Sequence, residues 1–300
     1  QNKMQKYKSA KKISFASEVY QKKAPGKHFA MTNKKENKFT RRVFAMNQKE
    51  KVQTQKNQEF SEHTHMKFAR LFGPLENRDN METGEKLTFK VPKVSNENDK
   101  GSVYDEFDLK TLDLKANMLW HTDSTFLPIP ALANIIAAKV IPSQGGQTEL
   151  SSTRAALVDL PGELYDKIAG RKIWHRLSHS RKKIDPRLAE LSKMTKWPDR
   201  KWHSIWKNPV NHKDALYIAS HAFQVEGMDT KTSQVLINNL IGFCTQKQYV
   251  YSHKWELGDV LVWDERAVLH RGRPWPYKEP RTLASICVSA TKSDGLDSIR

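Results

Sequence analysis

The sequence predicts an α+β protein whose core is a β-sandwich or jelly roll with helices on its flanks. Many short apolar segments are separated by turn residues, which predicts several strands, and only a few segments have helical periodicity. With 300 residues, the chain is long enough for one large domain or two small ones. It contains no run of 18 apolar residues, and no apolar segment follows its first basic residues, so neither a membrane span nor a secretory signal is expected.

Positive charge is concentrated at the N-terminus. Residues 1–60 contain 16 basic and 4 acidic residues, and so carry two thirds of the net charge of +18. A segment as rich in Lys, Gln and Asn as 1–58 buries too little apolar surface to offset the entropy cost of ordering it. We therefore expect a basic arm at 1–58 with little fixed structure, apart from a short strand at 13–19, and a folded domain at 59–300.

The first helix of the domain is predicted at 62–73. Apolar residues recur there at helical spacing, Ser61 is a suitable N-cap, and Gly73-Pro74 ends the segment. The residues that follow are polar and rich in turn formers, and strand pieces are expected at 87–91.

The strongest core signal is an apolar run at 134–141, which predicts a buried strand. Gly145-Gly146 interrupts this run, and 147–151 can form the next strand. Two helices are predicted after it: 154–159, capped by Ser152 or Thr153, and 161–170, with Pro161 in its first turn.

Residues 176–213 are basic and irregular and include Trp197, Trp202 and Trp206. The Trp-rich stretch 197–207 within it is either a lid over an anionic or aromatic substrate or an exposed insertion that its tryptophans anchor to the sheet. The remaining apolar patterns predict a strand at 215–221, a helix at 230–243, and strands at 258–263 and 281–289.

Two cysteines and several absent motifs narrow the function. Cys244 and Cys287 both lie in apolar surroundings, so no disulfide framework is expected and a reducing, cytoplasmic compartment is predicted. The sequence has no His-Glu-x-x-His or Cys-x-x-Cys pair, which excludes the common zinc sites. It also lacks a phosphate-binding P-loop and a Gly-x-Ser-x-Gly nucleophile turn.

His121-Thr122-Asp123 places an imidazole and a carboxylate two residues apart, on one face of a strand if the segment is extended. Such a pair is often only a histidine hydrogen-bonded to a loop carboxylate. His270, far downstream at the end of a predicted strand, is the second imidazole that makes metal binding plausible. Two His and one carboxylate on one side of a metal form the facial triad of non-haem Fe(II) oxygenases, which leaves positions open for substrate and O2.

A ferrous oxygenase needs a co-substrate that supplies two electrons, and 2-oxoglutarate can do so by chelating iron through its 2-oxo acid end. Its other carboxylate must then be held by a cation and a hydroxyl group. Arg281, eleven residues after His270, is a candidate because a guanidinium binds a carboxylate bidentately. Thr148 is a candidate hydroxyl donor. Taken alone, Arg281 would more often be a surface residue of a strand.

Several ordered motifs resemble the taurine / 2,4-dichlorophenoxyacetate dioxygenase family (TauD/TfdA). They are Trp120–Phe126, the turn at 142–149, and 258–271 followed by Pro280-Arg281. The resemblance extends from about residue 60 to the end of the chain and is greatest to the phenoxyacetate branch and its fungal relatives. Upstream of residue 60 the sequence departs from the family pattern, so the arm is either divergent or does not represent a native coding segment.

This resemblance implies a double-stranded β-helix (jelly-roll) core that binds Fe(II) and 2-oxoglutarate. His121, Asp123 and His270 would be the iron ligands, and Thr148 and Arg281 would hold the 2-oxoglutarate carboxylate. The usual reaction of the family hydroxylates a small organic molecule with O2, releases succinate and CO2, and can lead to C–O or C–S cleavage. Members often form dimers or tetramers, so a homo-oligomer is compatible with the resemblance.

Substrate recognition departs from the family pattern. Members that cleave sulfonates and phenoxyacetates have a second Arg, four residues after the first, that pairs with the substrate anion, and here that position is Ser285. Asn117 and His221 match positions on the substrate side of the family site, although a structural role suits each of them equally well. We expect a small anionic substrate of unknown identity.

Two other functions are compatible with the sequence. The basic arm could direct an oxygenase to nucleic acid, because Lys side chains neutralise phosphates. However, the charge lies outside the catalytic motifs and no base-reading module is visible, which disfavours a nucleic-acid partner. The chain could also be a non-catalytic binding protein on the same scaffold, but all five expected iron and 2-oxoglutarate residues are present, which counts against that function.

Overall fold

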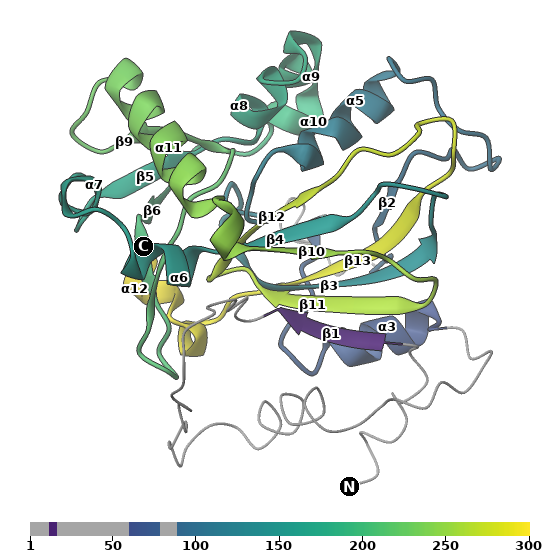
Figure 1. The fold of residues 1–300 in the computed structure, drawn as a ribbon, viewed down its shortest axis with the longest axis horizontal. Coiled ribbons are helices and arrows are strands. Elements are labelled where there is room, and N and C mark those ends of the chain that lie inside the picture. Colours follow the sequence, from purple (N-terminus) through teal and green to yellow (C-terminus); the bar gives the residue numbers. More distant parts are fainter. Residues whose placement is uncertain (1–11, 17–59, 79–88) are drawn as a thin grey trace, which may run out of the picture.

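The computed structural model of the protein describes residues 12–16, 60–78 and 89–300. The predicted basic arm lies outside the described residues, except for strand β1 (Lys12–Ala16), which overlaps the short strand expected there. Antiparallel sheets lie at the centre of the described residues, with helices around them (Figure 1). The fold is therefore of the mixed α+β class that the sequence predicts.

The larger sheet has five strands in the order β1-β11-β3-β13-β2. Its centre consists of β3 (Ala131–Val140), β11 (Asp259–Asp264) and β13 (Thr282–Ser289), in which both β11 and β13 are antiparallel to β3. Strand β2 (Lys93–Ser95) pairs with one end of β13, and β1 pairs with β11 in the parallel direction. The three central strands lie where the apolar runs predict them.

The smaller sheet has three antiparallel strands in the order β10-β4-β12. They are β10 (Val250–His253), β4 (Thr148–Ser152) and β12 (Val268–Gly272). At the outer edge of β12, His121 and His270 exchange two backbone hydrogen bonds, of 3.0 and 2.7 Å. The smaller sheet thereby fixes the position of the 121–123 segment.

Alternation of side chains along the strands explains how the two sheets pack. One face of the larger sheet presents Ile136, Leu261 and Leu283, and these residues form one buried cluster with Leu150 and Val268 of the smaller sheet. The two sheets are therefore packed layers of one core.

The opposite face of the larger sheet is covered by helix α3 (Glu62–Ala69). Phe68 belongs to a buried cluster with Ile135 and Val262, which are one position out of phase with the residues between the sheets. The hydroxyl of Ser61 accepts a hydrogen bond from the Thr64 amide, as expected of an N-cap. The helix ends four residues earlier than predicted.

Helices α6 (Thr153–Val158) and α11 (Thr230–Cys244) lie near the smaller sheet, and α11 packs in a buried cluster with Leu269 of β12. Both helices agree with the predictions for these segments. The next helix, α7 (Gly162–Asp166), is shorter than the expected 161–170: Pro161 is its N-cap instead of part of its first turn, and the helix ends four residues early.

The segment 172–225 differs most from the predictions, since it forms two small sheets, β6-β5-β9 and β7-β8, and three short helices. Its elements are β5 (Lys172–His175), α8 (Leu177–Lys182), α9 (Pro186–Glu190), α10 (Ser192–Thr195), β6 (Arg200–His203), β7 (Ile205–Lys207), β8 (Asp214–Leu216) and β9 (Ala222–Val225). The prediction of a single strand at 215–221 is wrong, because β8 ends at Leu216 and β9 begins at Ala222. A turn closed by a hydrogen bond from Ala222 N to Ala219 O separates β8 from β9.

The strand expected at 87–91 is also misplaced. Residues 87 and 88 lie outside the described residues, 89–91 are not in a strand, and β2 begins only at Lys93. Pro92 has no backbone N–H to donate to a sheet, which is consistent with a strand that starts after it. The other short elements are α5 (Leu109–Lys115), α12 (Leu296–Ile299), η1 (Ala116–Met118), η2 (Lys247–Tyr249) and η3 (Lys292–Asp294).

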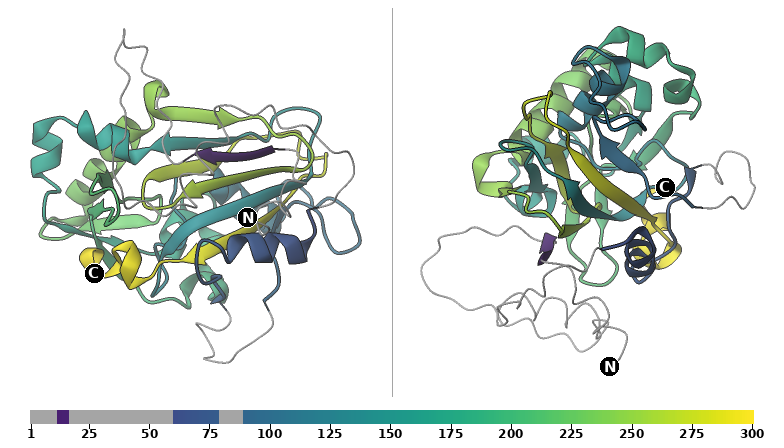
Figure 2. Two further views of the ribbon diagram at one scale, coloured as in Figure 1. Left: turned by 90° about the horizontal axis from the view of Figure 1, so that it is seen from below. Right: turned by 90° about the vertical axis from the view of Figure 1, so that its right-hand side faces the viewer.

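Two further views show α3 and the C-terminal helix α12 on the same side of the sheets (Figure 2). None of the helices in the described ranges is both long enough and apolar enough to cross a membrane.

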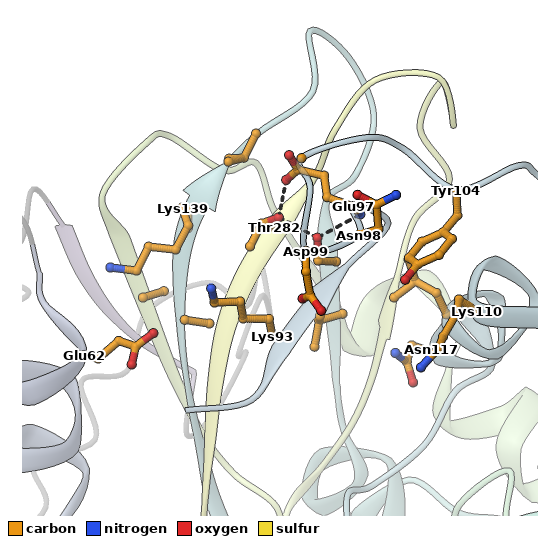
Figure 3. A pocket seen from close by; sticks show the side chains of 18 of the residues that line it. Glu62, Lys93, Glu97, Asn98, Asp99, Tyr104, Lys110, Asn117, Lys139 and Thr282 are labelled. Atoms are coloured by element: carbon orange, nitrogen blue, oxygen red, sulfur yellow. Dashed lines mark hydrogen bonds between the residues drawn. The ribbon is translucent and has the colours of Figure 1, made fainter. Parts of the chain in front are cut away.

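An open outer pocket of about 1250 Å³ lies beside strand β2. Lys93 of β2, Lys139 of β3 and Lys110 of α5 are on its wall, together with Asn117 (Figure 3). Asn117 also lines a second, smaller cavity, so the two cavities adjoin at this residue.

Candidate active site

The inner cavity has a volume of about 510 Å³ and is lined by residues of both sheets. Its wall includes all the residues that the sequence analysis selected: Asn117, His121, Asp123, Thr148, His221, His270 and Arg281. The structure thus brings together side chains from segments that are far apart in the sequence.

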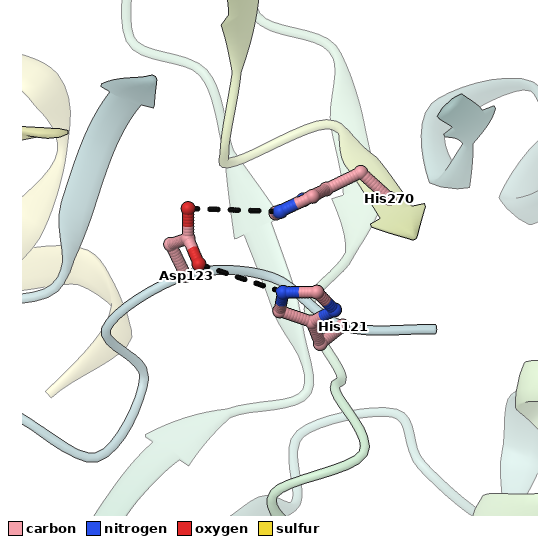
Figure 4. A group of neighbouring side chains, drawn as sticks. All are labelled: His121, Asp123 and His270. Atoms are coloured by element: carbon pink, nitrogen blue, oxygen red, sulfur yellow. Dashed lines mark ion pairs between the residues drawn. The ribbon is translucent and has the colours of Figure 1, made fainter. Parts of the chain in front are cut away.

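His121, Asp123 and His270 form a compact group in this cavity, with one potential ligand atom of each within 4.8 Å of the others. His121 Nε2 lies 3.6 Å from Asp123 Oδ1, and His270 Nε2 lies 3.6 Å from Asp123 Oδ2. The carboxylate of Asp123 faces both imidazoles (Figure 4). Two imidazoles and one carboxylate are the donor set of the facial triad, so these residues fit a divalent metal such as Fe(II).

The orientation of His121 is set by the backbone. Its Nδ1 lies 2.7 Å from the carbonyl oxygen of Leu119. Because a carbonyl oxygen can only accept, Nδ1 carries the hydrogen and Nε2 keeps its lone pair. The lone pair is thus on the nitrogen that faces Asp123.

The carboxylate of Asp123 is held by Asn134 of β3, whose side-chain amide donates a 2.7 Å hydrogen bond to Oδ2. Burial acts to raise the pKa of Asp123, but His270, His121 and the Asn134 bond outweigh it and hold this pKa well below its usual range. Burial lowers the pKa of His270 to about 3 and also lowers the pKa of His121. At neutral pH the triad consists of one carboxylate and two neutral imidazoles, the protonation states that metal ligation requires.

Arg281 is a buried cation, 4% exposed, that forms no ion pair with any described carboxylate. Its Nε and Nη2 donate to the carbonyl oxygen of Gly146 at 3.2 and 2.9 Å, and its guanidinium lies 5.0 Å from the ring centre of Trp275. Burial lowers its pKa to about 10, so it remains protonated at neutral pH. A buried charge without a counter-charge is costly, so this end of the cavity is suited to an anionic group.

The hydroxyl of Thr148 can donate a hydrogen bond into the same cavity. The indole Nε1 of Trp255 donates to Thr148 Oγ1 at 3.1 Å. Since an indole N–H can only donate, the Thr148 oxygen is the acceptor in this bond and its own hydrogen is available for another acceptor. A carboxylate in the cavity could therefore meet both a guanidinium and a hydroxyl donor.

A comparison with protein-family models matches residues 51–287 to the taurine catabolism dioxygenase TauD, TfdA family. The chain belongs to this family. The family predicted from the motifs around His121, Thr148 and His270 is thereby confirmed.

Curated relatives and solved structures agree with TauD/TfdA membership. The chain is 31% identical over 229 residues to the alpha-ketoglutarate-dependent 2,4-dichlorophenoxyacetate dioxygenase of Cupriavidus pinatubonensis, covering 75% of this chain and 80% of that protein. It is 31% identical over 231 residues to the (S)-phenoxypropionate/alpha-ketoglutarate-dioxygenase of Sphingobium herbicidovorans, covering 72% and 74% of the two chains. The crystal structure of AAD-2 in complex with Mn(II) and N-oxalylglycine superposes with a TM-score of 0.71 and 30% identity, covering 79% of this chain and 83% of that one.

On the other side of the triad, this TauD/TfdA protein has an aromatic wall. The ring of His221 lies 5.1 Å from that of Phe126 and 6.1 Å from that of His121, between ring centres. His221 Nδ1 is hydrogen-bonded to Ser180 Oγ at 2.9 Å. Burial, with a smaller contribution from Arg181, lowers the pKa of His221 well below its usual value, so its ring is neutral.

Ser285 occupies the position at which some family members have a second Arg, and it provides no cation to the cavity. Its hydroxyl donates to Asn134 Oδ1 at 3.0 Å, so it supports the amide that holds Asp123. Any cationic contact of the substrate must come from other residues of the wall.

Three buried residues of the site were not selected from the sequence: Asn134, Trp255 and Glu265. Glu265 is fully buried, and burial together with Asp123 raises its pKa well above its usual value. Asn134 lies within an apolar strand, and Glu265 follows the apolar run of β11. The sequence signal for both residues was a polar side chain inside or next to an apolar segment. That signal does not reveal which residue the side chain contacts.

Proposed function

We propose that the protein is an Fe(II)- and 2-oxoglutarate-dependent dioxygenase that hydroxylates a small organic anion, with succinate and CO2 as co-products. The enzyme class follows from TauD/TfdA membership and from relatives that are alpha-ketoglutarate-dependent dioxygenases. The observation that carries the proposal is a two-His, one-carboxylate group that shares a cavity with Arg281, a buried cation that pairs with none of the described carboxylates.

In this proposal, His121, Asp123 and His270 hold Fe(II), which when bound supplies the redox chemistry for the use of O2. Arg281 and Thr148 bind the carboxylate of 2-oxoglutarate that does not chelate the metal, one by charge and the other by its hydroxyl hydrogen. The neutral imidazoles and the ionised Asp123 require no proton release before metal binding at neutral pH.

For the substrate, we infer a small molecule with a carboxylate or a similar anionic group, bound on the side of Asn117 and His221. The two phenoxy-acid dioxygenases, to which the chain is 31% identical, are named for carboxylates linked through an ether oxygen. Hydroxylation of a carbon attached to such an oxygen gives a product that breaks the C–O bond. Cleavage would therefore follow from hydroxylation without any further catalytic residue.

We also assign the two packed sheets to a double-stranded β-helix, or jelly roll. Support comes from the antiparallel strands, from the buried cluster that joins the sheets, and from the position of the His270 strand beside the 121–123 segment. The division into an arm at 1–58 and an enzyme domain at 59–300 belongs to the same proposal. A cytoplasmic location and a homo-oligomeric state remain predictions.

Nucleic acid is not proposed as the substrate. That hypothesis depends on the charge of residues 1–58, nearly all of which lie outside the described residues. The curated relatives named above act on small molecules according to their names.

The experiment that tests the proposal compares His121→Ala with His63→Ala, which changes an exposed histidine of α3. Succinate formation from 2-oxoglutarate is measured with Fe(II) over a panel of phenoxy acids, sulfonates, amino-acid derivatives and purines. Substitution of a residue that supports a metal ligand typically lowers activity by roughly 10–100-fold. His121→Ala removes a ligand itself, so its rate of succinate formation should fall by more than this. Unchanged turnover in His121→Ala would contradict the proposal.

A second measurement needs no substrate. Anaerobic titration with Fe(II) and 2-oxoglutarate should produce a weak visible absorption band from the chelate. No band at saturating iron would favour a non-catalytic binding protein instead.

A further inference from the structure

The two histidines of the triad are supported differently. His121 Nδ1 is hydrogen-bonded to the Leu119 carbonyl at 2.7 Å, which fixes its ring. His270 Nδ1 is buried, and no described residue forms a hydrogen bond with it. The carboxylate oxygen Oε2 of Glu265 lies 3.7 Å from this nitrogen, a separation that a small rotation of the ring would bring into hydrogen-bonding range.

Glu265 is fully buried and lies beside two of the three triad residues, Asp123 and His270. Its Oε2 accepts a 3.0 Å hydrogen bond from the backbone N–H of Asp123. Its Oε1 accepts a 2.6 Å hydrogen bond from the indole of Trp263, whose ring centre lies 4.7 Å from that of His270. One carboxyl group thus contacts the segment of one ligand and the ring environment of another.

We propose that Glu265 is a positioning residue for the metal centre. Its Oε2 accepts the Nδ1–H of His270, so that Nε2 of that ring faces the metal, and it holds the Asp123 backbone at the same time. Glu265 acts through these two residues and is not itself a ligand. This inference rests on the proposed function and adds to it a residue that determines how tightly the metal is bound.

The physical reason is that a metal-bound imidazole needs an acceptor for its other N–H. Such an acceptor fixes the tautomer and the orientation of the ring, and a carboxyl group also increases the basicity of the ring. The backbone supplies this acceptor to His121 but not, within the described residues, to His270. The carboxyl group of Glu265 lies beside His270 Nδ1, the nitrogen that lacks an acceptor.

The test compares Glu265→Leu and Glu265→Gln with the parent protein in direct binding of Mn(II), measured by the EPR signal of the free ion. Glu265→Leu should weaken Mn(II) binding by about 10–100-fold, the usual cost of removing the acceptor of a metal-bound histidine. Glu265→Gln keeps a carbonyl oxygen that can accept from His270 and Asp123, but its NH2 group then faces the Trp263 N–H, so this variant should recover part of the loss. Parent-like binding by Glu265→Leu, or equally weak binding by both variants, would overturn the inference.

Two control variants separate positioning from a loss of stability and from failure of the proposed function. Leu240→Ala changes a buried residue of α11 that is not part of the site, and should lower the melting temperature while leaving Mn(II) affinity unchanged. If Leu240→Ala weakens Mn(II) binding as much as Glu265→Leu, the effect of Glu265 is only structural and the inference is wrong. Asp123→Ala should abolish Mn(II) binding, and if it does not, the proposed metal centre fails first.

Discussion

At the scale of single residues, the charge of Arg281 is the strongest constraint on what the cavity can bind. A carbonyl oxygen and an aromatic ring contact its guanidinium, but neither cancels its charge. Arg281→Gln should raise the KM for 2-oxoglutarate at least about 30-fold, which corresponds to the lower end of the cost of truncating one partner of a buried charge pair. Initial rates of succinate formation at varied 2-oxoglutarate measure this change.

The matched control is Arg187→Gln. The side chain of Arg187 is 63% exposed and pairs with Asp185 on the surface, so its removal should leave the KM for 2-oxoglutarate unchanged. A KM in Arg281→Gln that matches the control would mean that another group holds the carboxylate.

Trp255 provides a finer test of the same pocket, because its indole makes the Thr148 hydroxyl a donor to the cavity. Trp255→Phe removes one hydrogen bond, whose net value of about 0.5–1.5 kcal/mol corresponds to a rise of roughly 2–13-fold in the KM for 2-oxoglutarate. The same change in a Thr148→Val background should have little further effect, because the two residues act as one unit. Additive effects in this double-mutant cycle would show that Trp255 does not act through Thr148.

At the scale of elements, the turn between β3 and β4 places Arg281. Gly146 has φ +67°, and a Cβ added there would lie 3.0 Å from Arg281 Nε. Gly146→Ala should therefore displace the guanidinium and raise the KM for 2-oxoglutarate, in addition to the cost of about 1–2 kcal/mol for a left-handed residue. Enzyme kinetics and thermal unfolding of the same preparation measure the two effects separately.

Gly170→Ala is the matched control for Gly146→Ala, since Gly170 has φ +70° but no atom within 4 Å of an added Cβ. Both variants should lose stability, and only Gly146→Ala should change the KM. A similar KM in the two variants would show that the turn does not set the position of Arg281.

The elements that sequence reasoning predicted well are those whose burial is uniform along the segment. Strand β3 is an apolar run because sheets and helices cover both of its faces, and this pattern survives without knowledge of its neighbours. Burial alone misled the prediction at 215–221, where Tyr217, Ile218 and Ala219 are buried in the loop after β8 instead of in a strand. Apolar runs report burial, and they report backbone conformation only indirectly.

At the scale of the whole molecule, long-range contacts explain which site residues the sequence could indicate. The His-x-Asp pair is local, the donor set of a facial triad indicated His270, and the carboxylate of 2-oxoglutarate indicated Thr148 and Arg281, assignments that the family resemblance then supported. Glu265 contacts the Asp123 backbone across 142 positions, and no local pattern marks such a pair. Residues that bind ligands belong to motifs, whereas residues that position them depend on how the sheets pack.

The whole molecule also has a predictable response to acid, because it buries histidines away from the triad. His175 of β5 is fully buried, and neither ring nitrogen has a hydrogen-bond partner among the described residues. Burial lowers the pKa of His175 to about 3. Burial also lowers the pKa of His65 on α3 to about 4, against an opposing hydrogen bond to the Ile135 carbonyl.

The sign of the effect follows from proton binding in the two states. Below about pH 6.5, His175 becomes protonated in the unfolded chain but stays neutral in the folded protein. The free energy of unfolding therefore has its full value above about pH 6.5 and decreases as the pH falls towards 3. This histidine contributes up to about 1.4 kcal/mol per pH unit to the fall. His175→Leu, which removes the titrating group at similar volume, should therefore flatten the dependence of unfolding free energy on pH between 6.5 and 4 in urea titrations. His63→Gln, at an exposed position, should keep the parent slope, and an equally steep slope in His175→Leu would show that His175 is protonated without unfolding.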